Sequence, residues 1–410
     1  MRKRLVPFNK PSFTGAELKY IRQAVASGKI SGDGLFTEKC QKFLEKRFRL
    51  KKVLLTTSGT DALELAALLI GLDAGSEVIL PSYTFPSTAN AVLLRGARPV
   101  FVDIRSDTLN LDERALEAKI TSKTKAIFPV HYAGMACAMD KIMAIARKHN
   151  LFVVEDAAQA IGTQYDGKYL GAIGTLGCFS FHETKNVIAG EGGALLINDK
   201  SFIKRAEIIR EKGTNRSQFF RGKVKKYRWV DLGSSFLPSD ILAAFLYAQL
   251  ESFDVIQKKR KTLFDRYRKA FEPFESMGML QTPALPEKCK PNYHMFYLIL
   301  NSEQTRDRLA EYLRTQGILS VSHYQPLHLS PMGLKLGYKK GDFPVTEDRS
   351  MRLLRLPVYN SMTSSEQDYV ISYIHQFMKK PAPKRARSKR PSLSPRLELG
   401  AESYTSAGSL

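Results

Sequence analysis

The sequence predicts an α/β protein, with a mostly parallel seven-stranded sheet in a large domain and a smaller α+β domain toward the C-terminus. Two observations support this prediction. Seven short apolar runs alternate with amphipathic stretches between about residues 50 and 200. The runs are nearly continuous in apolar residues, as strands are when helices cover both faces of a parallel sheet.

The expected strands, in chain order, are the runs KVLLT, EVILP, RPVFVDI, KAIFPVHY, LFVVEDAA, GCFSF and GALLIND. Helix-like patterns such as ACAMDKIMAIARKHN lie between several of them, with apolar residues at helical spacing. The ligand site of such a sheet lies at the carboxyl ends of its strands, where the loops begin. The polar residues of interest in this chain fall at those ends.

A chain of 410 residues is too long for one simple core and suits two domains with a tail. We expect a large domain over residues 1–250 and a smaller one over 251–378, which holds HMFYLIL, ILSVSHYQPLH and a terminal helix around EQDYVISYIHQFM. Residues 379–410 are rich in Pro, Ser, Lys and Arg and have few side chains able to pack. They predict a disordered basic tail.

Composition narrows the class of protein without deciding it. The net charge of +23 suits nucleic acid, a membrane surface or an anionic small substrate. The basic start MRKRLVPFNKPSF has no apolar run after it, and DALELAALLIGL contains Asp61 and Glu64 and is too short for a bilayer, so we expect a cytoplasmic protein. Four cysteines without a CxxC pair and seven histidines without ligand spacing predict neither a metal site nor a disulfide framework.

Two motifs follow the first two expected strands. TTSGTDALELAALL places Ser58, Gly59 and Thr60 in a small-residue turn that opens a helix, where backbone N–H groups and the helix dipole can bind a phosphate. The alternative is a simple helix cap. PSYTFPSTANAV delivers Phe85 to the same layer of loops. Phe85 could stack on a flat heteroaromatic ring or fill the core.

The run LFVVEDAAQAIG ends in Glu155 and Asp156, with Gln159 close behind. A carboxylate at the end of a buried strand is costly unless it meets a positive partner. Asp156 could keep a pyridinium nitrogen protonated, and Gln159 could bond to a neighbouring phenolic oxygen. A helix-capping role for the aspartate is the alternative.

Lys185 lies between the last two expected strands, in GCFSFHETKNVIAGEGGALLIND. A lysine beside a buried aldehyde cofactor can form a Schiff base, because burial lowers the pKa of its amine enough for it to act as a nucleophile and later as a base. Ser180 precedes it and could donate to a phosphate, and the glycines after it allow a sharp return of the chain. A surface lysine in a hairpin loop is the alternative.

These motifs together resemble the DegT/DnrJ/EryC1/StrS family of nucleotide-sugar aminotransferases, which are pyridoxal-phosphate enzymes of fold type I. The resemblance rests on TTSGTDALELA, PSYTFPSTANAV, PVFVDI, PVHYAG, VVEDAAQAIG, SFHETKN with GEGGAL, and HYQPLH, and it covers roughly 375 residues. Within the family, GDGLFTEKCQKFLEKRF, VHYAGMACAMDKIMA and EIIREKGTNRSQFFRGKVKKYRW look like the branch of dTDP-4-amino-4,6-dideoxygalactose transaminases. That branch implies L-glutamate as amino donor, a dTDP-4-keto-6-deoxy sugar as acceptor, and synthesis of surface polysaccharide of the enterobacterial-common-antigen or O-antigen type.

The resemblance implies a role for each matching residue. Lys185 would hold pyridoxal 5'-phosphate as an imine and move protons during catalysis, and Asp156 would pair with the pyridine nitrogen. Gln159 would contact the ring hydroxyl, and Phe85 would stack on the ring. The phosphate would bind to three residues, Gly59, Thr60 and Ser180.

The family also implies a homodimer with active sites at the subunit interface. Many members send an Asn from the neighbouring subunit to the cofactor phosphate. The matching stretch GSSFLPSDI has Leu237 there instead, which puts that contact in doubt. The candidate substrate residues are His182, Arg216, His323 and Tyr324, with Arg221 and Lys226 as further candidates for the nucleotide diphosphate; a solvated basic loop is the alternative for the last two and Arg216.

Rival functions stay open at this point. The nearest is an aminotransferase of the same family that acts at C3 or on another nucleotide ketosugar. A dehydratase offshoot would replace the Schiff-base lysine by His, whereas Lys185 is present, and a cysteine desulfurase would need a mobile Cys, for which Cys289 is poorly placed. A non-catalytic protein that binds nucleotides or nucleic acid is the rival of another class, suggested by the basic composition, but the chain has no basic–aromatic interleaving.

Overall fold

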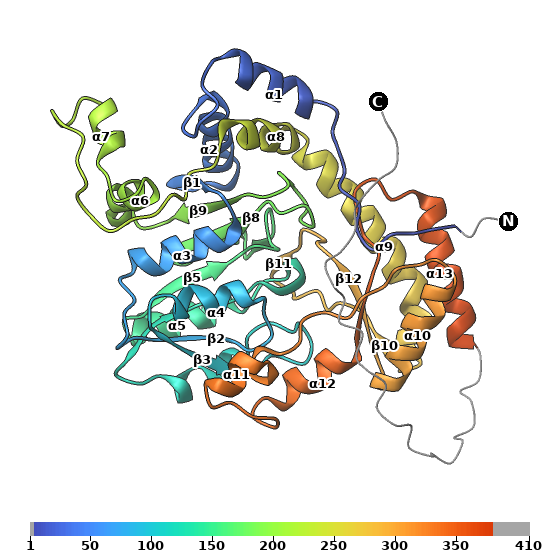
Figure 1. Ribbon diagram of the computed structural model, residues 1–410. Coiled ribbons are helices and arrows are strands. Elements are labelled where there is room, and N and C mark those ends of the chain that lie inside the picture. The colour runs from blue at the N-terminus through green and yellow to red at the C-terminus, as the bar shows by residue number, and fades with distance from the viewer. Residues whose placement is uncertain (1–3, 380–410) are drawn as a thin grey trace.

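The computed structural model describes residues 4–379. The expected disordered tail therefore lies outside the described residues except for Lys379, which ends the last helix instead of beginning a tail. Within the described part, helices surround a large sheet, and a smaller sheet with its own helices lies beside it (Figure 1). No helix among residues 4–379 is both long and apolar enough to cross a bilayer.

The seven expected strands form one sheet in the order β1-β9-β8-β5-β4-β2-β3. Neighbouring strands run parallel from β8 to β3, and β9 is antiparallel to both β1 and β8, so the prediction of a mostly parallel sheet is confirmed. The strands are β1 (Lys52–Thr56), β2 (Glu77–Pro81), β3 (Arg98–Val102), β4 (Thr124–Ile127), β5 (Phe152–Asp156), β8 (Leu176–Ser180) and β9 (Gly193–Ile197).

Helices cover both faces of this sheet, which explains why its strands are apolar throughout. Successive residues of a strand point to opposite faces. Val53 and Leu55 accordingly pack into one core and Leu54 into the other. The first core contains side chains of α2 (Leu35–Phe48), α5 (Met139–Lys148) and α8 (Asp240–Glu251), with α1 (Glu17–Ala26) packed on α8; the second contains α3 (Gly59–Leu69), α4 (Pro86–Leu93) and α6 (Ile203–Arg210).

A long helix, α9 (Phe253–Ser276), joins the large sheet to the C-terminal part of the chain (Figure 1). Phe253 and Ile256 in its first turns belong to a core of the large sheet, whereas Leu263, Phe264 and Tyr267 belong to the core of the small one. The small antiparallel sheet has the order β10-β12-β13, from β10 (Leu280–Gln281), β12 (Phe296–Leu300) and β13 (Leu353–Leu356). The predicted division between residues 250 and 251 stays a prediction.

Other elements tie the two parts together. Val6 forms a bridge with Ile318 and so joins the N-terminal segment to the C-terminal part. A third sheet pairs β11 (Cys289–Lys290) with β6 (Gln164–Tyr165), which also pairs with β7 (Lys168–Tyr169). The remaining helices are α7 (Arg216–Phe220), α10 (Glu303–Thr315), α11 (Pro331–Lys335), α12 (Pro344–Arg352) and α13 (Ser364–Lys379), and the 3-10 turns are η1 (Glu113–Ala115), η2 (Glu117–Lys119), η3 (Tyr132–Gly134), η4 (Lys200–Phe202) and η5 (Leu327–Leu329).

Candidate active site

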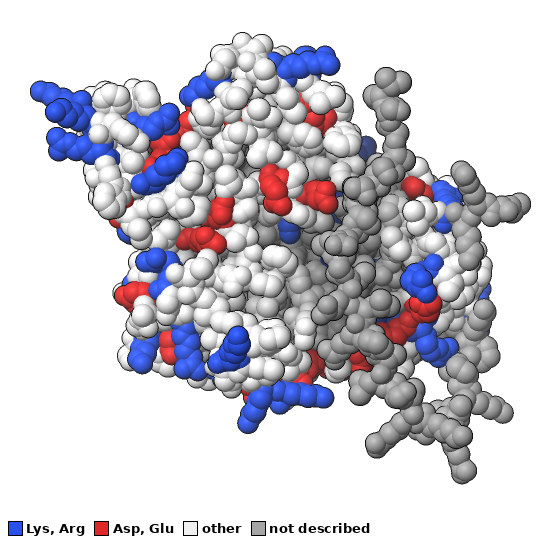
Figure 2. Space-filling model, viewed as in Figure 1, with Lys and Arg blue, Asp and Glu red and all other residues white. Residues whose placement is uncertain are grey.

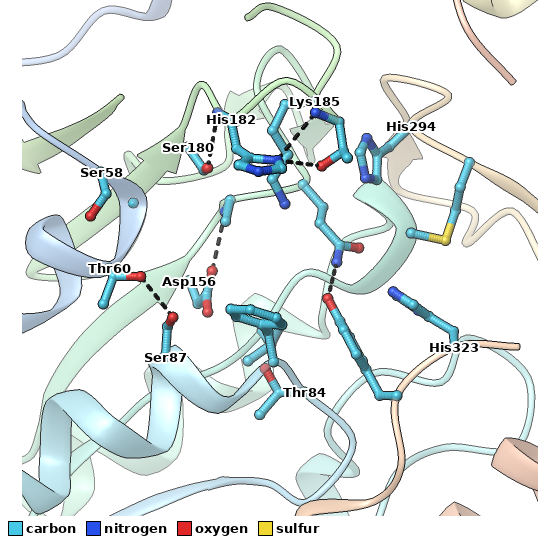
Figure 3. Close-up of a pocket in the computed structure, with 18 of the residues that line it drawn as sticks. Ser58, Thr60, Thr84, Ser87, Asp156, Ser180, His182, Lys185, His294 and His323 are labelled. Carbon is cyan, nitrogen blue, oxygen red and sulfur yellow. Dashed lines mark hydrogen bonds between the residues drawn. The ribbon is translucent and has the colours of Figure 1, made fainter. Parts of the chain in front are cut away.

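A cavity of about 450 Å³ lies where the large sheet meets the C-terminal part (Figure 3). Loops after β1, β2, β5 and β8 supply much of its lining, as expected for the carboxyl ends of parallel strands. The structure brings together ten of the residues predicted for the site: Gly59, Thr60, Phe85, Asp156, Gln159, Ser180, His182, Lys185, His323 and Tyr324.

Lys185 follows β8 and lines this cavity, so the alternative of a surface lysine in a hairpin loop does not hold. Its backbone N–H donates to the carbonyl of His182 at 2.9 Å, which fixes the loop. Burial lowers the pKa of its amine to about 8, the charge of Asp156 raises that pKa in part, and the charge of Arg355 lowers it further. The amine is therefore neutral far more often than that of an exposed lysine.

Asp156 ends β5 and is buried at the cavity wall. Its two carboxylate oxygens accept hydrogen bonds from the Thr88 hydroxyl at 2.7 Å and the Ala158 N–H at 3.2 Å. Glu155, one residue earlier, points to the opposite face of the strand, where it accepts three backbone N–H bonds of 2.6 to 2.8 Å. Strand alternation thus separates one carboxylate for the cavity from one that holds the fold.

Gln159 has a fixed orientation at the cavity wall. Its side-chain oxygen accepts the Ala133 N–H at 2.7 Å, so the amide nitrogen is the end left to donate. That nitrogen donates to the Tyr324 hydroxyl at 2.8 Å. The amide nitrogen carries two N–H groups, so the one that does not donate to Tyr324 can offer a hydrogen bond to a ligand oxygen.

The turn before α3 forms a small polar recess. Ser58 is the helix cap, because its hydroxyl accepts the Asp61 N–H at 3.0 Å, and Thr60 is left to face Ser87 at 2.7 Å between their hydroxyl oxygens. The first N–H groups of a helix have no partner within it. A Cβ on Gly59 would lie 2.7 Å from Cβ of Ser180, so only glycine lets these two segments approach. The recess therefore offers backbone and hydroxyl donors to an anion.

Phe85 precedes α4 and has 56% of its surface exposed, which excludes the alternative that it fills the core. Its ring centre lies 6.1 Å from that of Tyr324. Phe85 and Lys185 line the same cavity. A flat ring entering the cavity can therefore pack on Phe85.

Two histidines line the cavity in different surroundings. His182 keeps 40% of its side chain exposed, and its Nδ1 lies 2.9 Å from the Thr184 hydroxyl. Burial and the charges of Arg355 and Lys185 hold the pKa of His323 well below its usual range. The hydroxyl of Tyr132 lies 2.6 Å from Nδ1 of His323, whose ring stacks on Tyr324 at 3.6 Å between centres.

Arg216 is a predicted site residue that does not line the cavity within one chain, and the same holds for the further candidates Arg221 and Lys226. It lies on α7, where it forms an ion pair of 2.6 Å with Glu211 and covers the ring of Phe220. Arg221 pairs with Glu207, and Lys226 is exposed. Figure 2 shows Lys and Arg gathered at this projecting end of the molecule, around α7. Leu237 lies beside Gly32 of the same chain, where a Cβ on the glycine would meet it.

The sequence interpretation missed two residues that line the cavity, His294 and Arg355, and it missed Thr88, which holds Asp156 from behind the wall. Thr88 was present in PSYTFPSTANAV, one helical turn after Phe85, so its position on the same helix face could have revealed it. Arg355 interrupts the apolar run of β13, and a lone charge in such a run indicates a buried contact. His294 lies next to an apolar strand and had no comparable marker.

The cysteines do not support the desulfurase rival. All four lie unpaired and buried within the described residues. Burial raises the pKa of the Cys289 thiol to about 11, so a thiolate nucleophile is disfavoured there. Within residues 4–379, no group of three or more His, Cys, Asp or Glu side chains is arranged to hold a metal ion.

Comparisons with known proteins agree with this geometry. Residues 11–375 match the DegT/DnrJ/EryC1/StrS aminotransferase family. The chain is 34% identical to the spore coat polysaccharide biosynthesis protein SpsC of Bacillus subtilis, over 92% of this chain and 98% of that protein. It is 31% identical to the GDP-perosamine synthase of Escherichia coli O157:H7, over 91% of this chain and 98% of that protein.

A solved structure extends the agreement to the cofactor. A putative sugar aminotransferase from Streptococcus pneumoniae, in its PLP form, has a TM-score of 0.84 at 27% identity, covering 91% of this chain and 98% of that chain. The same protein has been solved in a PMP form, with a TM-score of 0.85. The chain described here belongs to the DegT/DnrJ/EryC1/StrS aminotransferase family and is a sugar aminotransferase that depends on pyridoxal phosphate.

Proposed function

We propose that the enzyme moves the amino group of L-glutamate to C4 of dTDP-4-keto-6-deoxy-D-glucose, giving 2-oxoglutarate and dTDP-4-amino-4,6-dideoxy-D-galactose for a cell-surface polysaccharide. The observation that carries amino transfer is the meeting of the Lys185 amine and the Asp156 carboxylate in one cavity. The sugar is supported by the motifs quoted above. Two relatives are named for polysaccharide synthesis and for a nucleotide-sugar product, in agreement with this class of substrate.

The cavity fits pyridoxal phosphate. The recess at Gly59, Thr60 and Ser180 would take the phosphate, since it combines free helix N–H groups with hydroxyls and excludes any side chain at position 59. Asp156 would hold the pyridine nitrogen protonated, and Gln159 would donate to the ring hydroxyl through the amide N–H that Tyr324 does not accept. Phe85 would cover the ring face. Lys185 would attach the aldehyde.

Pyridoxal phosphate, when bound, supplies an aldehyde that carries the amino group and a ring that takes up the electron pair left by a departing proton. The chain supplies the proton transfers. Lys185 Nζ accepts a proton from Cα of the amino donor and later delivers one to C4 of the sugar, because its pKa near 8 lets it exist in both forms at neutral pH. Thr88 and Ala158 fix the carboxylate of Asp156 during both transfers.

We place the enzyme in the cytoplasm as a homodimer. The segment around α7 projects from the body, and the side chains of Phe220 and Trp229 are 70% and 79% exposed. Two large apolar rings so exposed favour a contact with another subunit over a loop that meets only solvent. In a dimer this segment would carry Arg216, Arg221 and Lys226 toward the nucleotide diphosphate of the other subunit. With Leu237 in this chain, the cofactor phosphate would rely on its own subunit's donors.

The cofactor anchor is tested by intact mass after borohydride reduction. Wild type and Lys168→Ala, which removes an exposed lysine, should each gain the mass of one reduced pyridoxyl phosphate. Lys185→Ala should gain none. Attachment of the cofactor to the Lys185→Ala protein would remove the basis of the mechanism proposed here.

The acceptor is tested by offering four substrates to the cofactor-loaded enzyme with L-glutamate: dTDP- and GDP-linked 4-keto-6-deoxyhexoses and the corresponding 3-keto sugars. We expect the dTDP-4-keto sugar to give the highest kcat/KM. The GDP arm is included because a relative is named for a GDP-linked product. A higher kcat/KM for a GDP-linked sugar or for a 3-keto sugar would show that the proposed substrate is wrong and that the enzyme acts on that sugar instead, within the same enzyme class.

A further inference from the structure

Arg355 is a cavity-lining cation without a counter-ion. It lies on β13, in the C-terminal part of the chain, and its Nε atom is buried without a hydrogen-bond partner. Within residues 4–379 its guanidinium forms no ion pair or side-chain hydrogen bond; its carbon Cζ lies 4.6 Å from the centre of the Phe8 ring. Arg355 is half-buried, and a guanidinium partly removed from water without an anion is costly, so its retention needs a reason.

The surroundings of Arg355 offer no carboxylate. The ionisable groups that favour its charge are the hydroxyls of Tyr83, Tyr132 and Tyr324, and burial lowers the pKa of the guanidinium. The carboxylates that line the cavity are Asp156, which is held by Thr88, and Glu191, which lies mostly exposed beside His182. This part of the wall therefore has a positive charge that only a ligand can balance.

The part of the cavity wall that carries Arg355 is distinct from the recess proposed for the cofactor phosphate. Figure 3 shows Ser58, Thr60 and Ser180 on one side of the pocket and His294 and His323 on the other. Arg355 belongs to the second side, because it shares a small adjoining recess with Phe8, His294 and Met295. The charge of Arg355 also lowers the pKa of both histidines. The phosphate has its own donors, which leaves Arg355 for a substrate.

We propose that Arg355 binds the carboxylate attached to the reacting carbon of the amino donor. This inference rests on the proposed amino transfer. A guanidinium presents parallel N–H groups that match a carboxylate. The donor's carboxylate is one bond from the carbon that must reach Lys185, and Arg355 lies close enough to Lys185 to influence its charge. The diphosphate of a nucleotide sugar is joined to C1 of the hexose, several bonds from C4, and so suits an anion site farther from Lys185.

Cofactor-loaded wild type, Arg355→Gln and Arg355→Lys are compared by calorimetry with glutarate, a dicarboxylate without an amine, and separately with dTDP. Loss of a charge-assisted contact of about 1.5 to 3 kcal/mol should raise the Kd for glutarate about 10- to 150-fold in Arg355→Gln and less in Arg355→Lys. The Kd for dTDP should stay within about twofold. Arg352→Gln is the matched control, because Arg352 pairs with Asp348 outside this cavity.

The half-reaction with L-alanine, which has only the carboxylate on the reacting carbon, is followed through the absorbance of the bound cofactor. We expect the half-saturating concentration to rise about tenfold or more in Arg355→Gln. An unchanged Kd for glutarate together with a weaker Kd for dTDP would assign Arg355 to the nucleotide and overturn the inference. No change in either would reduce Arg355 to a stacking partner of Phe8 and also overturn it. Failure of L-glutamate to convert the wild-type cofactor, with glutarate still bound through Arg355, would refute the proposed donor instead.

Discussion

The hydroxyl of Thr88 donates a 2.7 Å hydrogen bond to Oδ2 of Asp156, and both side chains are buried. Thr88 lies on α4 and Asp156 at the end of β5, so the bond joins a helix to the strand end at the cavity wall. Oδ1 is held separately by the Ala158 N–H. The carboxylate is therefore fixed at both oxygens before any cofactor binds.

Replacing Thr88 by Val should weaken the binding of pyridoxal phosphate without unfolding the enzyme. The change keeps the shape of the side chain but removes one donor to a buried carboxylate, at a cost of about 1.5 to 3 kcal/mol. We expect the Kd for pyridoxal phosphate to rise about tenfold or more, measured by fluorescence titration of the cofactor-free protein. Thr88→Ser keeps the hydroxyl and should restore most of the affinity. Equal weakening by both variants would show that packing, rather than the hydrogen bond, is what matters at this position.

Much of the fold could be predicted from the sequence because its periodicity is strong. The apolar runs became the strands of the large sheet, and their ends delivered Asp156 and Lys185 to one cavity. Sequence patterns did not predict site residues whose contacts are with residues far away in the chain. Thr88 meets Asp156 across 68 positions, and Arg355 reaches the cavity from the opposite end of the chain.

Arg216 shows that a motif in the sequence does not by itself place a residue at the site. Its place in a basic segment suggested a nucleotide contact, yet Arg216 lies on α7 and pairs with Glu211 after α6, outside the cavity of its own chain. In the proposed dimer such a side chain would serve the site of the other subunit, and periodicity within one chain carries no information on a contact between chains. Gly59 was predicted from a motif, but the reason for glycine became visible only with Ser180 beside it.

A methyl group at position 59 should damage cofactor binding. In Gly59→Ala the new Cβ would lie 2.7 Å from Cβ of Ser180, so the turn or β8 must move and the phosphate recess must open. We expect the Kd for pyridoxal phosphate to rise by about tenfold or more, with a lower Tm for the loaded enzyme. Gly75→Ala, whose Cβ would make only an ordinary contact at 3.5 Å, should behave like wild type. A normal cofactor affinity in Gly59→Ala would argue against this recess as the phosphate site.

Changes at the two adjacent carboxylates of β5 should have different effects, one on stability and the other on activity. Glu155 is fully buried, accepts three backbone N–H groups and lies 3.0 Å from Nε2 of His131. Glu155→Gln replaces an acceptor by a donor on one side and should lower the free energy of unfolding by about 2 kcal/mol or more, measured by urea denaturation. Asp156→Asn should unfold much like wild type but lose nearly all amino transfer. The reverse pattern would exchange the roles assigned to the two residues.

The amine of Lys185 should titrate well below an ordinary lysine in the cofactor-free protein. Burial lowers its pKa to about 8, whereas a lysine in a peptide titrates at about 10.4. Its amine is thus mostly protonated below pH 8 and mostly neutral above it. Trace acetylation over a range of pH, with the modified Lys185 peptide quantified by mass spectrometry against an added lysine peptide, should show a midpoint near pH 8 for Lys185.

Two variants test the cause of this shift with opposite signs. The negative charge of Asp156 stabilises the ammonium form, so Asp156→Asn should move the midpoint for Lys185 to lower pH. The positive charge of Arg355 disfavours the ammonium form, so Arg355→Gln should move the midpoint to higher pH. Movement of both midpoints in the same direction would indicate a change in burial common to both variants. Opposite movements would establish that the two charges set the reactivity of the amine that attaches the cofactor.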